Sequence, residues 1–249
     1  MATWVDLDAE LQLWKDAGRS PTFWWRDDDT QAPTDDLDRL IALAERYAAP
    51  LHLAVIPVGT DPALAPRLSA SPLVYAMQHG FAHVNHEPKG TRASEIGDLR
   101  AVALQIADLR AGWQKLAMAE LPNLLPVLVP PWNRVAQKTL PHLPALGFRM
   151  LSAFDGGASA ADVAGLQQIN AHVDPVRWKN GAEFRGTEKT LAQVVEHLCA
   201  RRLGQANEPT GFLTHHLQTD AATWDFIDAL LDRLQGFEWI CLSSVIETP

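Results

Sequence analysis

The segment that decides the fold is Thr-Phe-Trp-Trp-Arg-Asp-Asp-Asp, residues 22–29. Its first four residues are mostly apolar and aromatic, which favours a short buried strand. Three consecutive carboxylates end the segment, and they repel one another unless a cation, a proton or solvent offsets their charge. An acidic run is also typical of a solvated turn before a helix. What the other strand ends carry decides between a solvated turn and a functional site.

The rest of the chain alternates short apolar runs with amphipathic helical patterns. The runs lie at 51–56, 73–78, 124–129, 211–214 and 237–242, with weaker ones at 147–152 and 166–173. Helices are predicted for 4–17, 34–44, 94–116, 191–202 and 220–234. Such alternation requires parallel strands joined by right-handed crossovers. We expect an α/β fold, a single distorted parallel (β/α) barrel of about seven or eight strands. One domain would then cover 1–249, with a doubly wound open sheet as the alternative.

The composition is that of a globular protein with a large core. Of 249 residues, 47% are hydrophobic and 20% are charged, and the formal net charge is −9. The acidic balance argues against a nucleic-acid partner, which rewards a basic surface. The two cysteines, Cys199 and Cys241, lack metal-ligand spacing and fit a reduced compartment. The N-terminus has no basic start or apolar run, so we expect a cytoplasmic protein without a membrane partner.

Polar clusters follow four of the predicted strands. They are found at 27–29, 79–86, 132–134 and 215–216. Five of the nine histidines fall at two of these strand exits. Because active sites of parallel α/β folds lie at the carboxyl ends of strands, we expect these clusters to form one site.

The histidine spacing indicates a metal site. His79 and His83 are four residues apart, so both imidazoles can reach one cation from a helix or from a turn. Such a pair alone is more often incidental, but an aspartate from another strand end would complete it. One carboxylate and two imidazoles leave room for water and substrate, as in catalytic zinc sites.

Other candidate groups are less specific. His215 and His216 are adjacent, so on a strand only one of them can face the pocket, where it could act as a general acid. His172 and Asp174, near Trp178, could line the same pocket. The sequence has no glycine-rich phosphate loop and no serine in a nucleophile-elbow context, which argues against covalent catalysis.

In this order, the motifs resemble those of the polysaccharide deacetylase family of carbohydrate esterases. They read Arg26-Asp27-Asp28-Asp29, His79 to His83, Val129-Pro130-Pro131-Trp132-Asn133 and Leu213-Thr214-His215, and they span nearly the whole chain. The resemblance implies a distorted parallel β/α barrel, in agreement with the alternation of elements.

The resemblance also implies roles for the site residues. Asp28 would be the catalytic base and Asp29 the metal ligand beside His79 and His83, while His215 would be the catalytic acid. A second register of the aspartate pair, Asp27 with Asp28, is also open.

The implied reaction is metal-dependent removal of an acetyl group from an N-acetylated sugar or polysaccharide. Zinc is the expected ion, with cobalt, manganese or nickel as alternatives. Trp132, Asn133, Arg26 and Asp174 would bind the substrate. The family's arginine before the Pro-Pro pair is absent, because Val129 stands there. Hydrolysis of another small intracellular amide and an inactive sugar-binding barrel therefore stay open as alternatives.

Overall fold

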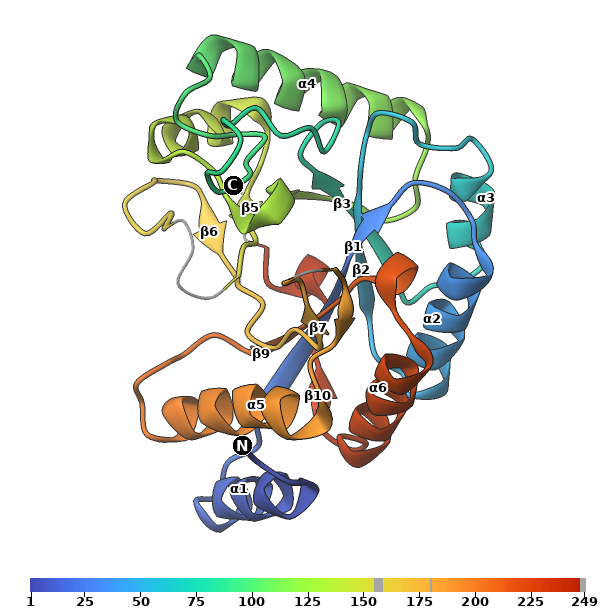
Figure 1. Cartoon of the computed structure of the whole chain (residues 1–249), viewed down its shortest axis with the longest axis vertical. Coiled ribbons are helices and arrows are strands. Elements are labelled where there is room, and N and C mark those ends of the chain that lie inside the picture. Colours follow the sequence, from blue (N-terminus) through green and yellow to red (C-terminus); the bar gives the residue numbers. More distant parts are fainter. Residues whose placement is uncertain (155–158, 180, 247–249) are drawn as a thin grey trace. The chain divides into compact units, whose positions relative to one another are not determined.

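The computed structural model describes residues 1–154, 159–179 and 181–246 (Figure 1). The strands are β1 (Thr22–Thr30), β2 (Leu51–Val55), β3 (Val74–His79), β4 (Leu124–Val129), β5 (Met150–Leu151), β6 (Gln167–Gln168), β7 (Val176–Arg177), β8 (Glu183–Phe184), β9 (Thr210–Thr214) and β10 (Glu238–Trp239). The α-helices are α1 (Trp4–Asp16), α2 (Asp35–Arg46), α3 (Leu64–Ser69), α4 (Val102–Met118), α5 (Thr187–Arg202) and α6 (Ala221–Arg233). Short 3-10 helices include η1 (Pro131–Asn133) and η4 (His216–Gln218).

The main sheet is parallel wherever its register is resolved. Its order is β10-β1-β2-β3-β4-β5-β6, and β9 also pairs with β1. The pairs of β1 with β9 and β10 are parallel, as are the pairs along β3, β4, β5 and β6. Only β7 and β8 form a separate antiparallel pair among the described strands. The predicted α/β class with parallel strands is therefore confirmed.

Two compact units interleave along the sequence. Unit 1 comprises Met1–Asp27, Asp35–Leu51 and Ala171–Cys241, and unit 2 comprises Asp28–Thr34, His52–Asn170 and Leu242–Pro249. The boundary falls inside β1, between Asp27 and Asp28. A single domain over 1–249 stays a prediction.

Unit 1 is built around the aromatic part of β1. Trp24 and Trp25 are fully buried, and the β1 backbone pairs in register with β9, from Phe23 opposite Thr210 to Asp27 opposite Thr214. Helix α1 packs on α5 (Figure 1), and the Trp14 indole donates to the Leu198 carbonyl oxygen at 3.2 Å. Burial of these large side chains fixes β1 in the sheet, at about 1.5–3 kcal/mol for each one.

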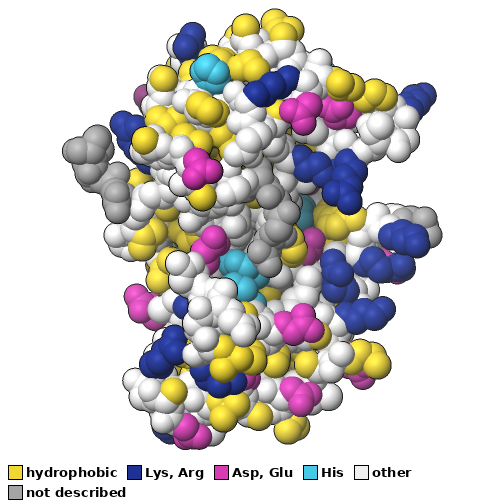
Figure 2. Space-filling view, turned by 90° about the vertical axis from the view of Figure 1, so that its left-hand side faces the viewer, with side chains coloured by type: hydrophobic (Ala, Val, Ile, Leu, Met, Phe, Trp, Pro, Cys, Tyr) yellow, Lys and Arg dark blue, Asp and Glu magenta, His cyan; other side chains and the backbone are white. Residues whose placement is uncertain are grey.

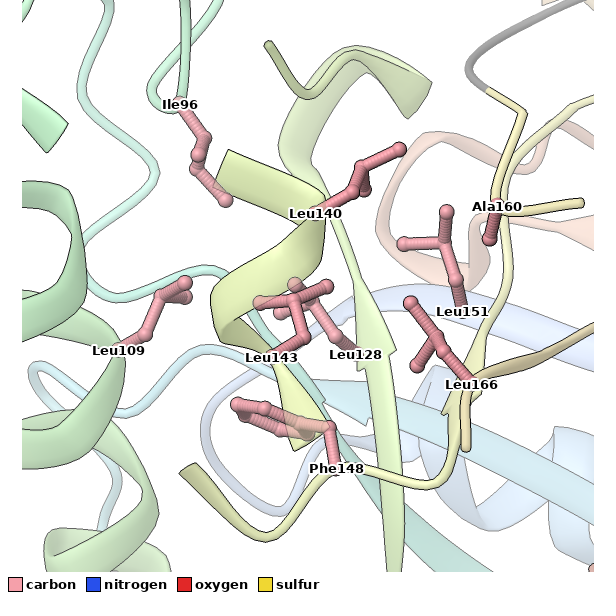
Figure 3. Packing of buried hydrophobic residues seen from close by; sticks show 9 residues of the cluster. All are labelled: Ile96, Leu109, Leu128, Leu140, Leu143, Phe148, Leu151, Ala160 and Leu166. Atoms are coloured by element: carbon pink, nitrogen blue, oxygen red, sulfur yellow. The ribbon is translucent and has the colours of Figure 1, made fainter. Parts of the chain in front are cut away.

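Unit 2 has its own core, shown in Figure 3. Leu128 of β4 and Leu151 of β5 pack there with Leu109 of α4 and with Phe148. All four side chains are at most 1% exposed. This packing anchors β4, whose end carries the Pro-Pro-Trp-Asn loop.

Helix α4 begins at Val102, so the prediction of a helix from residue 94 was wrong for its first two turns. Residues 94–97 instead form long-range interactions. The Ser94 hydroxyl donates to the Arg134 carbonyl oxygen at 3.3 Å, and Ile96 forms an isolated parallel bridge with Val135. The periodicity of the apolar residues did not reveal these partners, because they are distant in sequence.

Charged side chains of both signs are interspersed over the face shown in Figure 2. The net charge of −9 is thus not gathered into one acidic patch on that face. Within the described ranges, every helix is too short or too polar to cross a membrane.

Candidate metal centre

The aspartates lie inside β1 rather than after it. The strand continues through Asp27 and Asp28 to Thr30, whereas the apolar run predicted an end at Trp25. Asp27 and Asp28 are at most 2% exposed. Asp29 has a φ of 73°, a left-handed conformation that is uncommon for residues other than glycine. This local turn interrupts the regular alternation of side chains along the strand.

Asp29, His79 and His83 converge in unit 2. The Oδ1 atom of Asp29 lies 3.2 Å from Nε2 of His79 and 3.3 Å from Nε2 of His83. One ligand atom from each residue falls within 4.8 Å of the other two. These are the three residues that the sequence motifs suggested as metal ligands.

His79 is held by the strand next to its own. It ends β3 and is 1% exposed, and its Nδ1 lies 2.9 Å from the Val129 carbonyl oxygen at the end of β4. Because a carbonyl oxygen can only accept, Nδ1 must carry the proton, which leaves Nε2 as a possible ligand atom. Burial lowers the pKa of His79, but the hydrogen bond with Asp29 and the charges of Asp28 and Asp29 outweigh it, so the pKa is raised.

His83 is held by a turn and by an aromatic ring. Its φ is 54°, and its imidazole lies over the Trp132 ring with 4.3 Å between centroids. Burial, and then the nearby His79, lower the pKa of His83 below its ordinary value. A neutral imidazole is the form that binds a metal.

Left-handed residues gather around this cluster. Among the described residues other than glycine, seven have positive φ, and four of them are Asp29, His83, Trp132 and Asn133. Each such residue costs on the order of 1–2 kcal/mol. Strain of this kind is kept where the surrounding structure enforces it, which is common at functional sites.

The donor set fits a divalent metal ion. Two imidazole nitrogens and one carboxylate oxygen form one of the three-ligand sets that hold catalytic zinc. His79 already has the hydrogen bond from Nδ1 to a backbone carbonyl that metal-binding histidines require. Asp29, His79 and His83 would hold the ion.

His215 lies in unit 1, just after β9. It is 7% exposed, and the Trp178 ring meets its imidazole edge-on with centroids 4.6 Å apart. The Trp178 indole donates to Oδ2 of Asp174 at 3.0 Å. Burial raises the pKa of Asp174, and the nearby His215 opposes this shift. The structure thus brings the predicted residues His215 and Asp174 together with Trp178.

His216 and Asp27 form a separate buried network in unit 1. Nδ1 of His216 lies 2.5 Å from Oδ1 of Asp27, and Oδ2 of Asp27 accepts from the His216 backbone N–H at 3.0 Å and the Thr214 hydroxyl at 2.7 Å. Both Asp27 and His216 are at most 1% exposed. Asp27 is therefore hydrogen-bonded within unit 1.

The remaining predicted residues have these positions. Asp28 belongs to unit 2, and its charge raises the pKa of His79. Arg26 is fully buried in the unit 1 part of β1. Trp132 and Asn133 lie in η1, directly after β4, where Trp132 covers His83. Arg134 donates to the Ala93 carbonyl oxygen at 2.8 Å.

No protein-family model matches the sequence, and no curated protein matches it. Solved structures do match. A Mycobacterium smegmatis protein assigned as a polysaccharide deacetylase superposes with a TM-score of 0.62 at 12% identity, over 91% of this chain and 92% of that one. The chain has the polysaccharide deacetylase fold.

Two further structures with the polysaccharide deacetylase fold agree. Peptidoglycan deacetylase PdaC from Bacillus subtilis matches with a TM-score of 0.55 and 13% identity, over 91% of this chain and 90% of that one. A family 4 carbohydrate esterase from Streptomyces lividans, solved with acetate, matches with a TM-score of 0.54 and 12% identity, over 87% and 88%. The predicted distorted (β/α) barrel and the resemblance to this fold are thereby confirmed.

The sequence motifs missed the residues that hold the loop of residues 80–84, which carries His83. Gly80 has a φ of 54°, and Gln78 donates through Nε2 to the Gly80 carbonyl oxygen at 2.8 Å. Glu95 accepts hydrogen bonds from the same loop. A glycine directly after a predicted strand signals a tight turn, but no sequence signal pairs Glu95 with residues 11 to 14 positions earlier.

Proposed function

We propose that the chain is a metal-dependent hydrolase that removes an acetyl or related acyl group from the nitrogen of an N-acylated sugar. The observation that supports this most directly is the convergence of Asp29, His79 and His83 with both Nε2 atoms beside one carboxylate oxygen. The fold supports the same proposal, since one protein with this fold was solved with acetate, the product of deacetylation.

Zinc is the metal we propose, because two imidazoles and one carboxylate form one of its catalytic ligand sets. When bound, a divalent ion supplies polarisation of the acyl carbonyl and a lower pKa for a bound water. Asp29 lies beside the Nε2 atoms of both imidazoles, while the Val129 carbonyl holds the proton of the neutral His79 ring on Nδ1, so that Nε2 is the atom available to a metal.

Two further groups would move protons. Asp28 would accept the proton of the attacking water, and His215 would donate a proton to the departing amine. Asp174 supports this placement of His215, because its carboxylate accepts the indole N–H of Trp178, whose ring packs edge-on against the His215 imidazole. Trp132, Asn133, Arg26 and Asp174 stay predictions as substrate contacts, and Trp132 offers an aromatic face to a sugar ring.

The test is acetate release from N-acetylglucosamine, its oligomers and a small linear N-acetyl amide. We expect release with zinc, and loss of release after chelation. Acetate release from the oligomers alone would favour a polysaccharide as the natural substrate. Release from the linear amide alone would favour a small amide. Saturable sugar binding without acetate release from the zinc-loaded protein would refute the hydrolase and leave a sugar-binding barrel.

Two histidine variants test the metal site itself. His79→Ala should abolish stoichiometric zinc binding, whereas His86→Ala should keep it, because His86 is an exposed residue outside the cluster. Normal zinc content in His79→Ala would refute the site.

A separate pair of variants tests the roles of Asp28 and Asp29. Asp28→Asn should keep zinc and lose turnover, and Asp29→Asn should lose zinc. The reverse pattern would show that the register of the pair is wrong.

A further inference from the structure

The loop that carries His83 closes around one buried carboxylate. Glu95 is 2% exposed. Its Oε2 accepts from the Phe81 N–H at 2.9 Å, and its Oε1 accepts from the N–H groups of Ala82 at 2.8 Å and Val84 at 3.4 Å. Three backbone donors thus point at one side chain from a different segment.

Close packing fixes this arrangement. A Cβ atom on Gly80 would lie 2.1 Å from Oε2 of Glu95 and 2.6 Å from the Cδ and Cγ atoms of Pro131. The carboxylate therefore lies directly against the backbone between the two histidines. Only glycine leaves space for it there, and the positive φ of Gly80 also favours glycine.

The loop has further anchors, but they hold other positions. The Val58 N–H donates to the Phe81 carbonyl oxygen at 2.9 Å, and the Gly80 N–H donates to Val129 at 3.0 Å. The N–H groups of residues 81, 82 and 84 flank His83, and Glu95 is their acceptor. A buried N–H left without an acceptor costs about 1–3 kcal/mol.

Glu95 is itself held away from α4. The Ser94 N–H donates to Oδ1 of Asn85 at 3.0 Å, and the His86 N–H donates to the Ser94 carbonyl oxygen at 3.0 Å. The segment around Glu95 is thus tied to the chain that follows His83. This explains why residues 94–97 do not join the helix.

We propose that Glu95 is a positioning residue of the metal centre: by accepting the N–H groups of Phe81, Ala82 and Val84, it keeps His83 in its left-handed conformation beside Asp29 and His79. This inference rests on the proposed function. Hydrogen-bond partners of metal-ligating side chains usually contribute 10–100-fold to metal affinity, and we expect an effect of that size from Glu95.

The test measures zinc affinity by calorimetry for the wild type, Glu95→Gln and Glu95→Ala. The glutamine amide keeps one acceptor oxygen but turns an NH₂ group toward a backbone N–H, so we expect about 10-fold weaker binding. The alanine removes every acceptor, and we expect about 100-fold weaker binding. In both zinc-free variants the amides of Phe81 and Ala82 should exchange hydrogen faster than in the wild type.

The control is Leu68→Ala, which removes a fully buried side chain of α3 in the same unit. It should lower stability without changing zinc affinity or the exchange of these two amides. Wild-type zinc affinity in Glu95→Ala would overturn the positioning role alone. Failure of the wild type to bind zinc would overturn the proposed function and, with it, the positioning role.

Discussion

The buried imidazole of His172 makes the stability of unit 1 sensitive to acid. Its Nδ1 accepts the Gly211 N–H at 3.0 Å, so this nitrogen carries no proton and the ring is neutral. The ring stacks on His197 with 3.5 Å between centroids. Burial, followed by repulsion from His197 and Arg201, lowers the pKa of His172 from 6.5 to about 3.

The direction of the pH effect on stability follows from the protonation of His172 in the unfolded and folded chains. Below pH 6.5 the unfolded chain takes up a proton on this histidine, whereas the folded chain does so only near pH 3. The stabilising contribution is therefore complete above pH 6.5 and is lost as the pH falls toward 3. The full pKa difference corresponds to at most about 5 kcal/mol, and the loss between pH 7 and pH 4 to about 3 kcal/mol. Glu208, 3.6 Å from Nε2, favours protonation and makes these values upper limits.

The assay is urea unfolding followed by tryptophan fluorescence at pH 7 and pH 4. In His172→Asn, the side-chain oxygen can replace Nδ1 as the acceptor for Gly211, but the side chain does not titrate. The free energy of unfolding should fall between the two pH values by about 3 kcal/mol less in the variant than in the wild type. His142→Asn controls for removal of an exposed imidazole. An equal loss in the wild type and in His172→Asn would refute the reasoning.

Three further outcomes are expected. Gly80→Ala should destabilise the protein by about 3 kcal/mol and weaken zinc binding, because its Cβ displaces Glu95 or Pro131 and its φ is positive; an unchanged unfolding midpoint would contradict this. Asp27→Asn should cost about 3–5 kcal/mol in urea unfolding, because it removes the buried charge and replaces one of the two oxygens that contact His216 with an NH₂ group; stability within 1 kcal/mol of the wild type would show that the network contributes little. Dialysis against a chelator should remove acetate release, and added zinc should restore it; activity that survives verified metal removal would exclude a metal requirement.

Local patterns predicted the positions of the strand ends well. Strand β4 spans the predicted run at 124–129, and β3 ends at His79, one residue beyond the predicted run at 73–78. Buried parallel strands are nearly continuous apolar runs, so the point where such a run becomes polar is visible in the sequence. His79 and His215 could therefore be assigned to strand ends from the sequence, whereas the aspartate run lies inside β1.

The same patterns failed where long-range hydrogen bonds compete with local propensity. The aspartates extend β1 because their backbone pairs with β9 and their side chains find buried partners such as His216. Residues 94–97 leave the helix because Ser94 and Glu95 bind other segments. Neither partner is close in sequence, so no local window contains the information.

The sequence by itself determined the alternation of strands and helices, and with it the parallel fold and the strand ends that carry acidic and imidazole groups. Only the tertiary structure showed that Asp29 lies beside His79 and His83, and that Glu95 accepts hydrogen bonds from their loop. The physical reason is that the burial of a strand shows in the order of its own apolar and polar residues. The position of one of three adjacent carboxylates instead depends on a left-handed turn at Asp29 and on partners distant in the chain.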